Sequence, residues 1–94
     1  MKVDGKTLPF QEEGESDGWV IRRFSAEVNP EELRWHRDGE DREIRVMESD
    51  GWALQKDNAL PQELRKNESH SVRKGEWHRL LRGSGELVLR IKKL

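Results

Sequence analysis

The sequence contains no cysteine among its 94 residues. The chain therefore forms no disulfide bond, offers no thiolate nucleophile and cannot build a cysteine-ligated zinc site. It also lacks a glycine-rich phosphate-binding loop, and no serine, histidine and aspartate stand in the order and context of a hydrolase elbow. Two common catalytic arrangements thus find no support, and the missing thiols fit a reducing compartment.

Long apolar runs and basic stripes are missing as well. No segment approaches the roughly 20 apolar residues that a transmembrane helix needs, and no signal peptide is visible. The 18 Lys and Arg residues are interleaved with 19 Asp and Glu residues, which leaves a formal net charge of −1. The electrostatic footprint of a nucleic-acid-binding protein is therefore missing. We expect a soluble cytoplasmic protein that binds neither membrane nor nucleic acid.

No segment shows the 3.6-residue period of a long helix. Apolar and polar residues instead alternate over short segments, which predicts strands at 19–28, 42–48, 52–55, 62–66, 69–72, 77–81 and 86–94. Turn signals separate these segments about every eight to twelve residues, as in all-β sandwiches and barrels. A single helical turn is expected at 29–33, where Asn29 can cap and Pro30 suits the first helical position.

The composition lies near that of disordered chains, with 39% charged and 32% hydrophobic residues. Folding is nevertheless indicated, because the four Trp and two Phe residues fall inside the alternating segments, the extended segment 34–38 or the short N-terminal edge strand, and not in a polar tract. The length predicts one small domain spanning 1–94. We expect residues 1–18 to form loop and a short edge strand around Val3, Leu8 and Phe10, with a solvated loop at 11–18.

The run from Asn67 to His78 reads as strand, tight turn and strand. Its spacing resembles the second sequence motif of the cupin family, which is a glycine, five residues, Pro-x-Gly, two residues and a metal-binding histidine. Gly75 and His78 match that motif, whereas Asn67 and Arg73 replace its first glycine and its proline. The resemblance covers roughly residues 28–94 and implies an all-β cupin-type double-stranded β-helix, that is, a jelly-roll barrel. The segments Trp35-His36-Arg37-Asp38 and Gly51 to Asn58 also resemble small uncharacterised cupin-like proteins of phage and environmental sequences.

The first cupin motif is His-x-His, three or four residues, a glutamate, six residues and a glycine. On that pattern the resemblance places His36, Asp38, Arg42 and Ser49 at the four motif positions. An alternative count puts Glu43 in the glutamate position. It is rejected, because Ile44 and Val46 are expected to face inward and Glu43 would then face outward.

His36, Asp38 and His78 are the predicted metal ligands. His36 and Asp38 are two residues apart on an extended segment, so they share a face. Two imidazoles and one carboxylate are the donors of the facial triad of non-heme Fe(II) oxygenases, and they also suit Mn, Ni or Zn, so ligand type alone does not select the metal. The expected cofactor is therefore a divalent transition metal, or none.

Arg42 is the reason to keep the metal-free alternative open. Its guanidinium stays protonated, cannot ligate and would repel a dication. It is expected to pair with Asp38, which would leave two polar histidines in a vestigial site. Arg42 and His70 are the candidate ligand-binding residues, since Arg42 can anchor an anionic group and His70 shares strand parity with Val72.

Trp19, Trp35, Trp52 and Trp77 are interpreted as core or dimer contacts rather than as a platform for stacking a ligand. Trp35 and Trp77 each precede a candidate histidine, so alternation points both away from the cavity. Two functions remain open: a metal-dependent cupin that acts on a small polar or anionic molecule, and a non-catalytic cupin that binds a small anion or carbohydrate or serves as a homodimeric interaction module.

Overall fold

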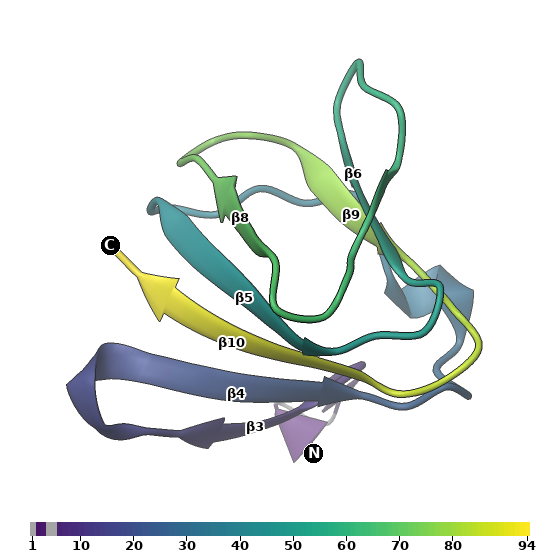
Figure 1. Ribbon diagram of the computed structural model, residues 1–94, viewed down its shortest axis with the longest axis horizontal. Coiled ribbons are helices and arrows are strands. Elements are labelled where there is room, and N and C mark those ends of the chain that lie inside the picture. The colour runs from purple at the N-terminus through teal and green to yellow at the C-terminus, as the bar shows by residue number, and fades with distance from the viewer. Residues whose placement is uncertain (1, 4–5) are drawn as a thin grey trace.

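The computed structural model describes residues 2–3 and 6–94, which form short antiparallel strands and two single turns of 3-10 helix (Figure 1). The strands are β1 (Lys2–Val3), β2 (Lys6–Thr7), β3 (Gln11–Gly14), β4 (Trp19–Phe24), β5 (Arg42–Glu48), β6 (Ala53–Lys56), β7 (Gln62–Glu63), β8 (Ser69–Val72), β9 (His78–Leu81) and β10 (Leu87–Lys93). The 3-10 turns are η1 (Ser16–Gly18) and η2 (Pro30–Glu32). Within these described ranges, no helix has the length and apolar character needed to cross a membrane.

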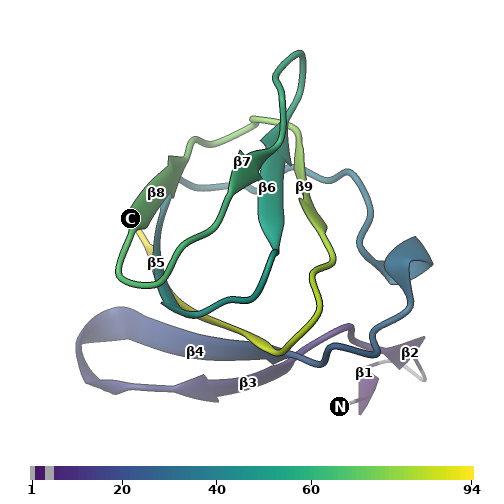
Figure 2. The ribbon, with the colours of Figure 1, turned by 45° about the vertical axis from the view of Figure 1, so that its right-hand side comes forward.

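Two sheets enclose the interior. The larger has five strands in the order β3-β4-β10-β5-β8, and the smaller has three in the order β7-β6-β9. Figure 2 shows β6, β7 and β9 facing β4, β5 and β10 across that interior. The last strand, β10, lies between β4 and β5 and is antiparallel to both. The C-terminal strand therefore joins two earlier strands of the chain into one continuous sheet of the barrel.

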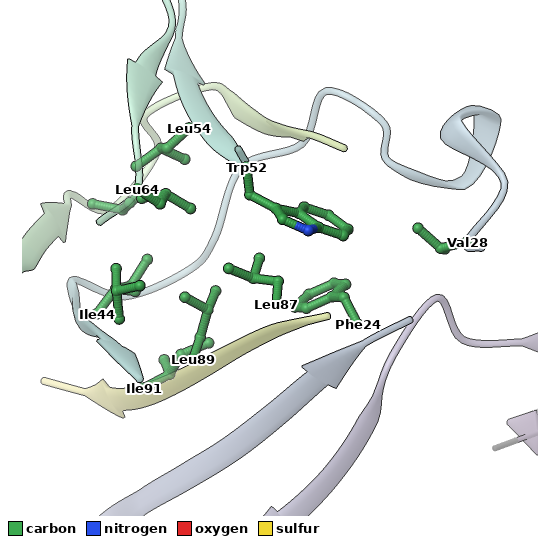
Figure 3. Close-up of a cluster of buried hydrophobic side chains, with 11 residues drawn as sticks. Phe24, Val28, Ile44, Trp52, Leu54, Leu64, Leu87, Leu89 and Ile91 are labelled. Atoms are coloured by element: carbon green, nitrogen blue, oxygen red, sulfur yellow. The ribbon is translucent and has the colours of Figure 1, made fainter. Parts of the chain in front are cut away.

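The core lies between the two sheets (Figure 3). Trp52 is fully buried on the side of the smaller sheet, and its ring centroid lies 5.8 Å from that of Phe24 on β4. The Trp52 Nε1–H donates to the backbone oxygen of Gly85 at 2.8 Å, which satisfies the one polar group of the side chain. Leu87, Leu89 and Ile91 supply alternate inward positions of β10. The period-two pattern of the sequence therefore becomes one face of the core.

Most strands occur where the alternation predicts them. The segments 42–48 and 69–72 are strands over those residues. The strand predicted at 52–55 is shifted by one residue to Ala53–Lys56, and the other predicted strands are present with shortened ends. The largest difference is β4, which ends at Phe24 rather than at 28. The helical turn is also confirmed, since the Asn29 side chain accepts a hydrogen bond from the Glu31 N–H at 3.0 Å.

The prediction of a solvated loop at 11–18 is wrong for its first half. Gln11–Gly14 forms the edge strand β3 and pairs with β4 in the register Glu12↔Arg22 and Glu13↔Ile21. Glu12 forms an ion pair with Arg22, so complementary charges join two strands that the sequence separates by several residues. A charged, exposed edge of this kind also protects the sheet from further pairing. Residues 1, 4 and 5 of the predicted terminal segment lie outside the described residues.

Candidate metal centre

His36 and His78 lie directly opposite each other on two antiparallel segments. The His36 N–H donates to the His78 oxygen at 3.0 Å, and the His78 N–H donates to the His36 oxygen at 2.9 Å. Opposite residues of an antiparallel pair project to the same side. The ring centroids are accordingly only 4.3 Å apart. The bridge thus brings together two histidines that are 42 positions apart in the sequence.

Backbone carbonyls fix the orientation of both imidazoles. The Nδ1 atom of His36 lies 2.9 Å from the Arg34 oxygen, and Nδ1 of His78 lies 2.7 Å from the Glu76 oxygen. A carbonyl oxygen only accepts, so Nδ1 carries the proton in each ring. The Nε2 atoms keep their lone pairs. This is the arrangement that outer hydrogen bonds give to metal-binding histidines.

Asp38 supplies a carboxylate beside these lone pairs. Its Oδ2 lies 3.3 Å from His78 Nε2, is buried, and has no hydrogen-bond partner. With the His78 proton on Nδ1, two acceptors face each other. A cation between the two atoms would satisfy both, and two ligands bound to one ion at about 2.1 Å lie about 3 Å apart in an octahedral arrangement. Donor atoms of His36, Asp38 and His78 all fall within 4.8 Å of one another, so the residues fit a divalent metal.

A proton fits the same position less well. Burial lowers the pKa of His78 from its ordinary value of 6.5, and the nearby charges of His36 and Arg42 lower it further. The hydrogen bond to the Glu76 carbonyl and the charge of Asp38 raise the pKa, but the net direction is down. The neutral imidazole, which can bind a metal, is therefore the favoured form.

The turn at Gly75 holds the two halves of the site together. Gly75 has a φ of +77°, a conformation that favours glycine, and its N–H donates to the Asp38 oxygen at 3.0 Å. The neighbouring Lys74 N–H donates to Asp41 Oδ1 at 2.8 Å. The turn that leads to His78 therefore also binds the backbone of Asp38, through the Gly75 N–H.

Arg42 is close to the site, but its positive charge is balanced by the carboxylate of Glu40. Its Nε and Nη2 donate to Glu40 Oε1 at 3.2 and 3.0 Å, and Nη2 lies 3.4 Å from Asp38 Oδ1. The ion pair that the sequence predicts between Arg42 and Asp38 is therefore present. It occupies Oδ1 and leaves Oδ2 directed toward His78.

A cavity of about 370 Å³ opens beside these residues. Its walls are mostly apolar, and its polar lining residues are Arg22, Glu32, Arg34, His36, Asp38, Arg42 and His78. Four of the five predicted site residues thus meet in one place. Their roles as ligands stay predictions.

His70 is the candidate that the structure places elsewhere. It lies on β8 opposite Ile44, its side chain is nearly buried, and it does not line the cavity. Its Nε2 lies 3.6 Å from Glu68 Oε1 instead. Alternation with Val72 predicts which face of its strand His70 lies on. It does not predict how far along the barrel from the cavity His70 lies.

Arg34 also lines the cavity, but it precedes the first cupin motif, which begins at His36, and a guanidinium is no metal ligand, so the motif does not indicate it. It stands two residues before His36, so the same alternation that joined His36 to Asp38 would have found it.

None of the four tryptophans lines the cavity, which agrees with their interpretation as core or surface contacts and not as a ligand platform. Trp52 and Trp19 are buried, whereas Trp35 and Trp77 are 39% and 43% exposed and do not line the cavity. The outward direction that alternation predicts for Trp35 and Trp77 is confirmed.

Comparison with protein families finds no match, and comparison with curated proteins finds none either. Solved structures do match. A cupin-2 domain protein of Shewanella frigidimarina has a TM-score of 0.67 at 16% identity, over 95% of this chain and 83% of that one. A cupin domain of Bordetella pertussis has a TM-score of 0.62 at 16% identity, over 96% and 99%. HppE with Fe(II) and substrate has a TM-score of 0.65 at 14% identity, over 98% of this chain and 59% of HppE.

These similarities show the fold. The chain has the all-β cupin jelly-roll architecture, as the motif around Gly75 and His78 predicted. Identities of this size do not extend to activity, because one fold hosts many unrelated functions.

Proposed function

We propose that this small cupin-fold protein binds a divalent transition metal through His36, Asp38 and His78, beside a cavity for a small polar or anionic molecule. The observation that carries the proposal is the unpartnered Asp38 Oδ2, which lies buried 3.3 Å from an imidazole nitrogen that is itself an acceptor. Buried polar atoms are nearly always satisfied, so an orphan of this kind calls for a missing partner. A cation satisfies all three donors together.

Fe(II), Mn(II), Ni(II) and Zn(II) all suit two imidazoles and one carboxylate. Bound there, such an ion would supply a Lewis acid with open coordination positions, and Fe would add redox chemistry. The neighbouring protein groups do the positioning: the Arg34 and Glu76 carbonyls orient the rings, and the Gly75 N–H holds the Asp38 backbone. The structure of HppE that matches this fold contains Fe(II), which makes iron a natural first ion to test.

A second candidate function rests on Arg42. The 3.4 Å contact between Arg42 Nη2 and Asp38 Oδ1 favours a metal-free polar cluster. In that case the chain would be a non-catalytic cupin that binds a small anion or carbohydrate, or a homodimeric interaction module. The two candidates differ in one measurable property, which is metal affinity at this cluster.

Metal titration with a matched pair of histidine variants separates them. Protein purified without chelator would be analysed for metal content and then titrated with each ion by calorimetry, anaerobically for Fe(II). His36→Gln removes an exposed ligand with little risk to folding, and His70→Gln is the control outside the cavity. We expect His36→Gln to weaken binding by at least about 100-fold, beyond the 10–100-fold typical of outer-shell changes, and His70→Gln to leave it unchanged. Near-zero occupancy of the wild type, or equal affinity in both variants, would overturn the proposal.

The homodimer and the cytoplasmic location are also proposed. The exposed Trp35 and Trp77 side chains support a dimer contact, because aromatic side chains are enriched in interfaces. Sedimentation velocity across a range of concentrations tests the dimer, and a monomer at every concentration would exclude it.

A further inference from the structure

We propose that Arg34, rather than Arg42, is the anion-binding group of the cavity, and that it takes a small organic acid with one carboxylate on a short apolar body. The inference rests on the proposed metal site, because the cavity needs the charge of the metal before it attracts an anion.

Three arginines line the cavity, and two of them already have carboxylate partners. Arg22 is paired with Glu12, and Arg42 with Glu40 and Asp38. Across the described part of the chain, no carboxylate lies within ion-pair distance of Arg34, whose Nε donates to the Glu31 backbone oxygen at 3.1 Å. Its terminal nitrogens are therefore the donors available to a ligand. A guanidinium presents these donors as a fork that matches a carboxylate.

Arg34 is also correctly placed relative to the predicted metal ligands. Arg34, His36 and Asp38 occupy alternate positions of one extended segment, and all three line the cavity. An extended chain advances about 7 Å over two residues, which is the largest separation along the wall that the Arg34 and His36 backbones can have. The Arg34 carbonyl fixes the His36 ring at 2.9 Å, which ties the anion-binding residue to a metal ligand through the backbone.

Apart from its charged residues and histidines, the cavity is lined by apolar side chains. Phe10, Phe24, Leu33 and Leu80 are among them. The guanidinium of Arg22 lies 4.3 Å from the Phe10 ring centroid, so it covers the ring and faces its own partner Glu12. A volume of about 370 Å³ is near the lower end of small-molecule sites, which are about 300–1,000 Å³. The walls thus favour a hydrocarbon body of a few carbons.

Charge explains why metal and anion should bind together. The Arg22–Glu12 and Arg42–Glu40 pairs are each neutral, and the exposed Lys93 is a more distant partner of Glu40 at 3.8 Å, outside the cavity lining. Arg34 then stands against the cavity carboxylates Asp38 and Glu32, so the lining residues counted with Glu12 and Glu40 carry one net negative charge without metal. A divalent cation changes that to one net positive charge, which suits a monoanion.

Hexanoate is the probe, and its neutral counterpart hexanamide controls for the apolar body. Both would be titrated by calorimetry into wild type, Arg34→Gln and Arg37→Gln, each loaded with whichever ion the wild type binds and each also metal-free. Arg37→Gln is the matched control, since Arg37 lies on the same segment but outside the cavity, with its guanidinium 5.2 Å from the Trp77 ring centroid.

We expect hexanoate to bind the loaded wild type and the Arg37 variant alike, and the Arg34 variant about 10- to 100-fold more weakly, as for loss of a charge-assisted hydrogen bond. Hexanamide should show no such difference, and metal-free protein should bind hexanoate at least tenfold more weakly than loaded protein. The metal affinities of the variants, measured first, separate the two proposals. If the metal binds but hexanoate affinity is the same in wild type and Arg34→Gln, or undetectable in both, the assignment of Arg34 is wrong and the metal site stands. If no metal binds, both proposals fall.

Discussion

Replacing Asp38 with Asn should make the metal-free protein more stable while it abolishes metal binding. In the metal-free protein, Oδ2 of Asp38 faces the acceptor Nε2 of His78 at 3.3 Å and has no hydrogen-bond partner. The amide of the variant could donate to that nitrogen, because the Glu76 carbonyl keeps the His78 proton on Nδ1. The substitution thus converts two opposed acceptors into a donor and an acceptor.

The magnitude follows from the contacts. An unsatisfied buried polar group costs about 1–3 kcal/mol. Part of the gain is offset, because the contact at 3.4 Å between Arg42 and the charged Oδ1 is weakened. Arg42 keeps its two hydrogen bonds to Glu40, so its charge is not left unpaired. We expect a net gain of about 1 kcal/mol, which raises the melting temperature of a domain of this size by about 4–8 °C.

Metal should reverse the order of stability. At a free metal concentration 100 times the dissociation constant, the wild type gains about 2.7 kcal/mol, and the Asn variant gains almost none. The assay is thermal and urea denaturation at pH 8 with chelator and with excess metal. Asp57→Asn, on an exposed turn, is the control and should change stability by less than about 0.5 kcal/mol. The reasoning is refuted if the metal-free Asp38 variant is less stable than the wild type by 1 kcal/mol or more, since Asp38 would then be a structural partner of Arg42.

Two further predictions concern His78 and the turn at Asn67. Burial lowers the pKa of His78 in the folded protein, so the unfolded chain takes up a proton first as the pH falls through 6.5, and the metal-free protein loses stability below that pH. Urea midpoints between pH 8 and pH 5 should fall less steeply for His78→Gln than for the wild type, and equal slopes would contradict the assignment. Asn67 has a φ of +72°, so Asn67→Ala should lower the free energy of unfolding by about 1 kcal/mol while Asn67→Gly does not. Chemical denaturation measures both variants, and an alanine variant as stable as the glycine variant would show that the backbone is not strained there.

The strands and the turn glycine could be predicted because their signals are local. Alternation at 42–48 needs only that inward positions be apolar, and Ile44 and Val46 are indeed buried. The turn at Gly75 needs only a residue that tolerates positive φ. Edge strand β3 could not be predicted in the same way. Its residues are all exposed, and what orders them is a partner strand, above all Arg22 opposite Glu12, that composition alone does not reveal.

The site shows the same division between local and long-range information. Parity placed His36 and Asp38 on one face, and the second motif placed His78 near them. The alternation of residues along a strand did not show that His70 lies outside the cavity, because alternation gives the face of a strand and not its position in the barrel. Nor could the sequence show that Glu40 compensates Arg42, since that depends on the bend between Asp38 and β5.

In the proposed metal site, one ion is held by His36, Asp38 and His78. Anomalous diffraction from crystals grown with the best-binding ion tests it most directly. One anomalous peak is expected about 2.0–2.3 Å from the Nε2 atoms of both histidines and from a carboxylate oxygen of Asp38, with Arg42 still bonded to Glu40. A map without a peak at this position, with Asp38 closed onto Arg42, would contradict it.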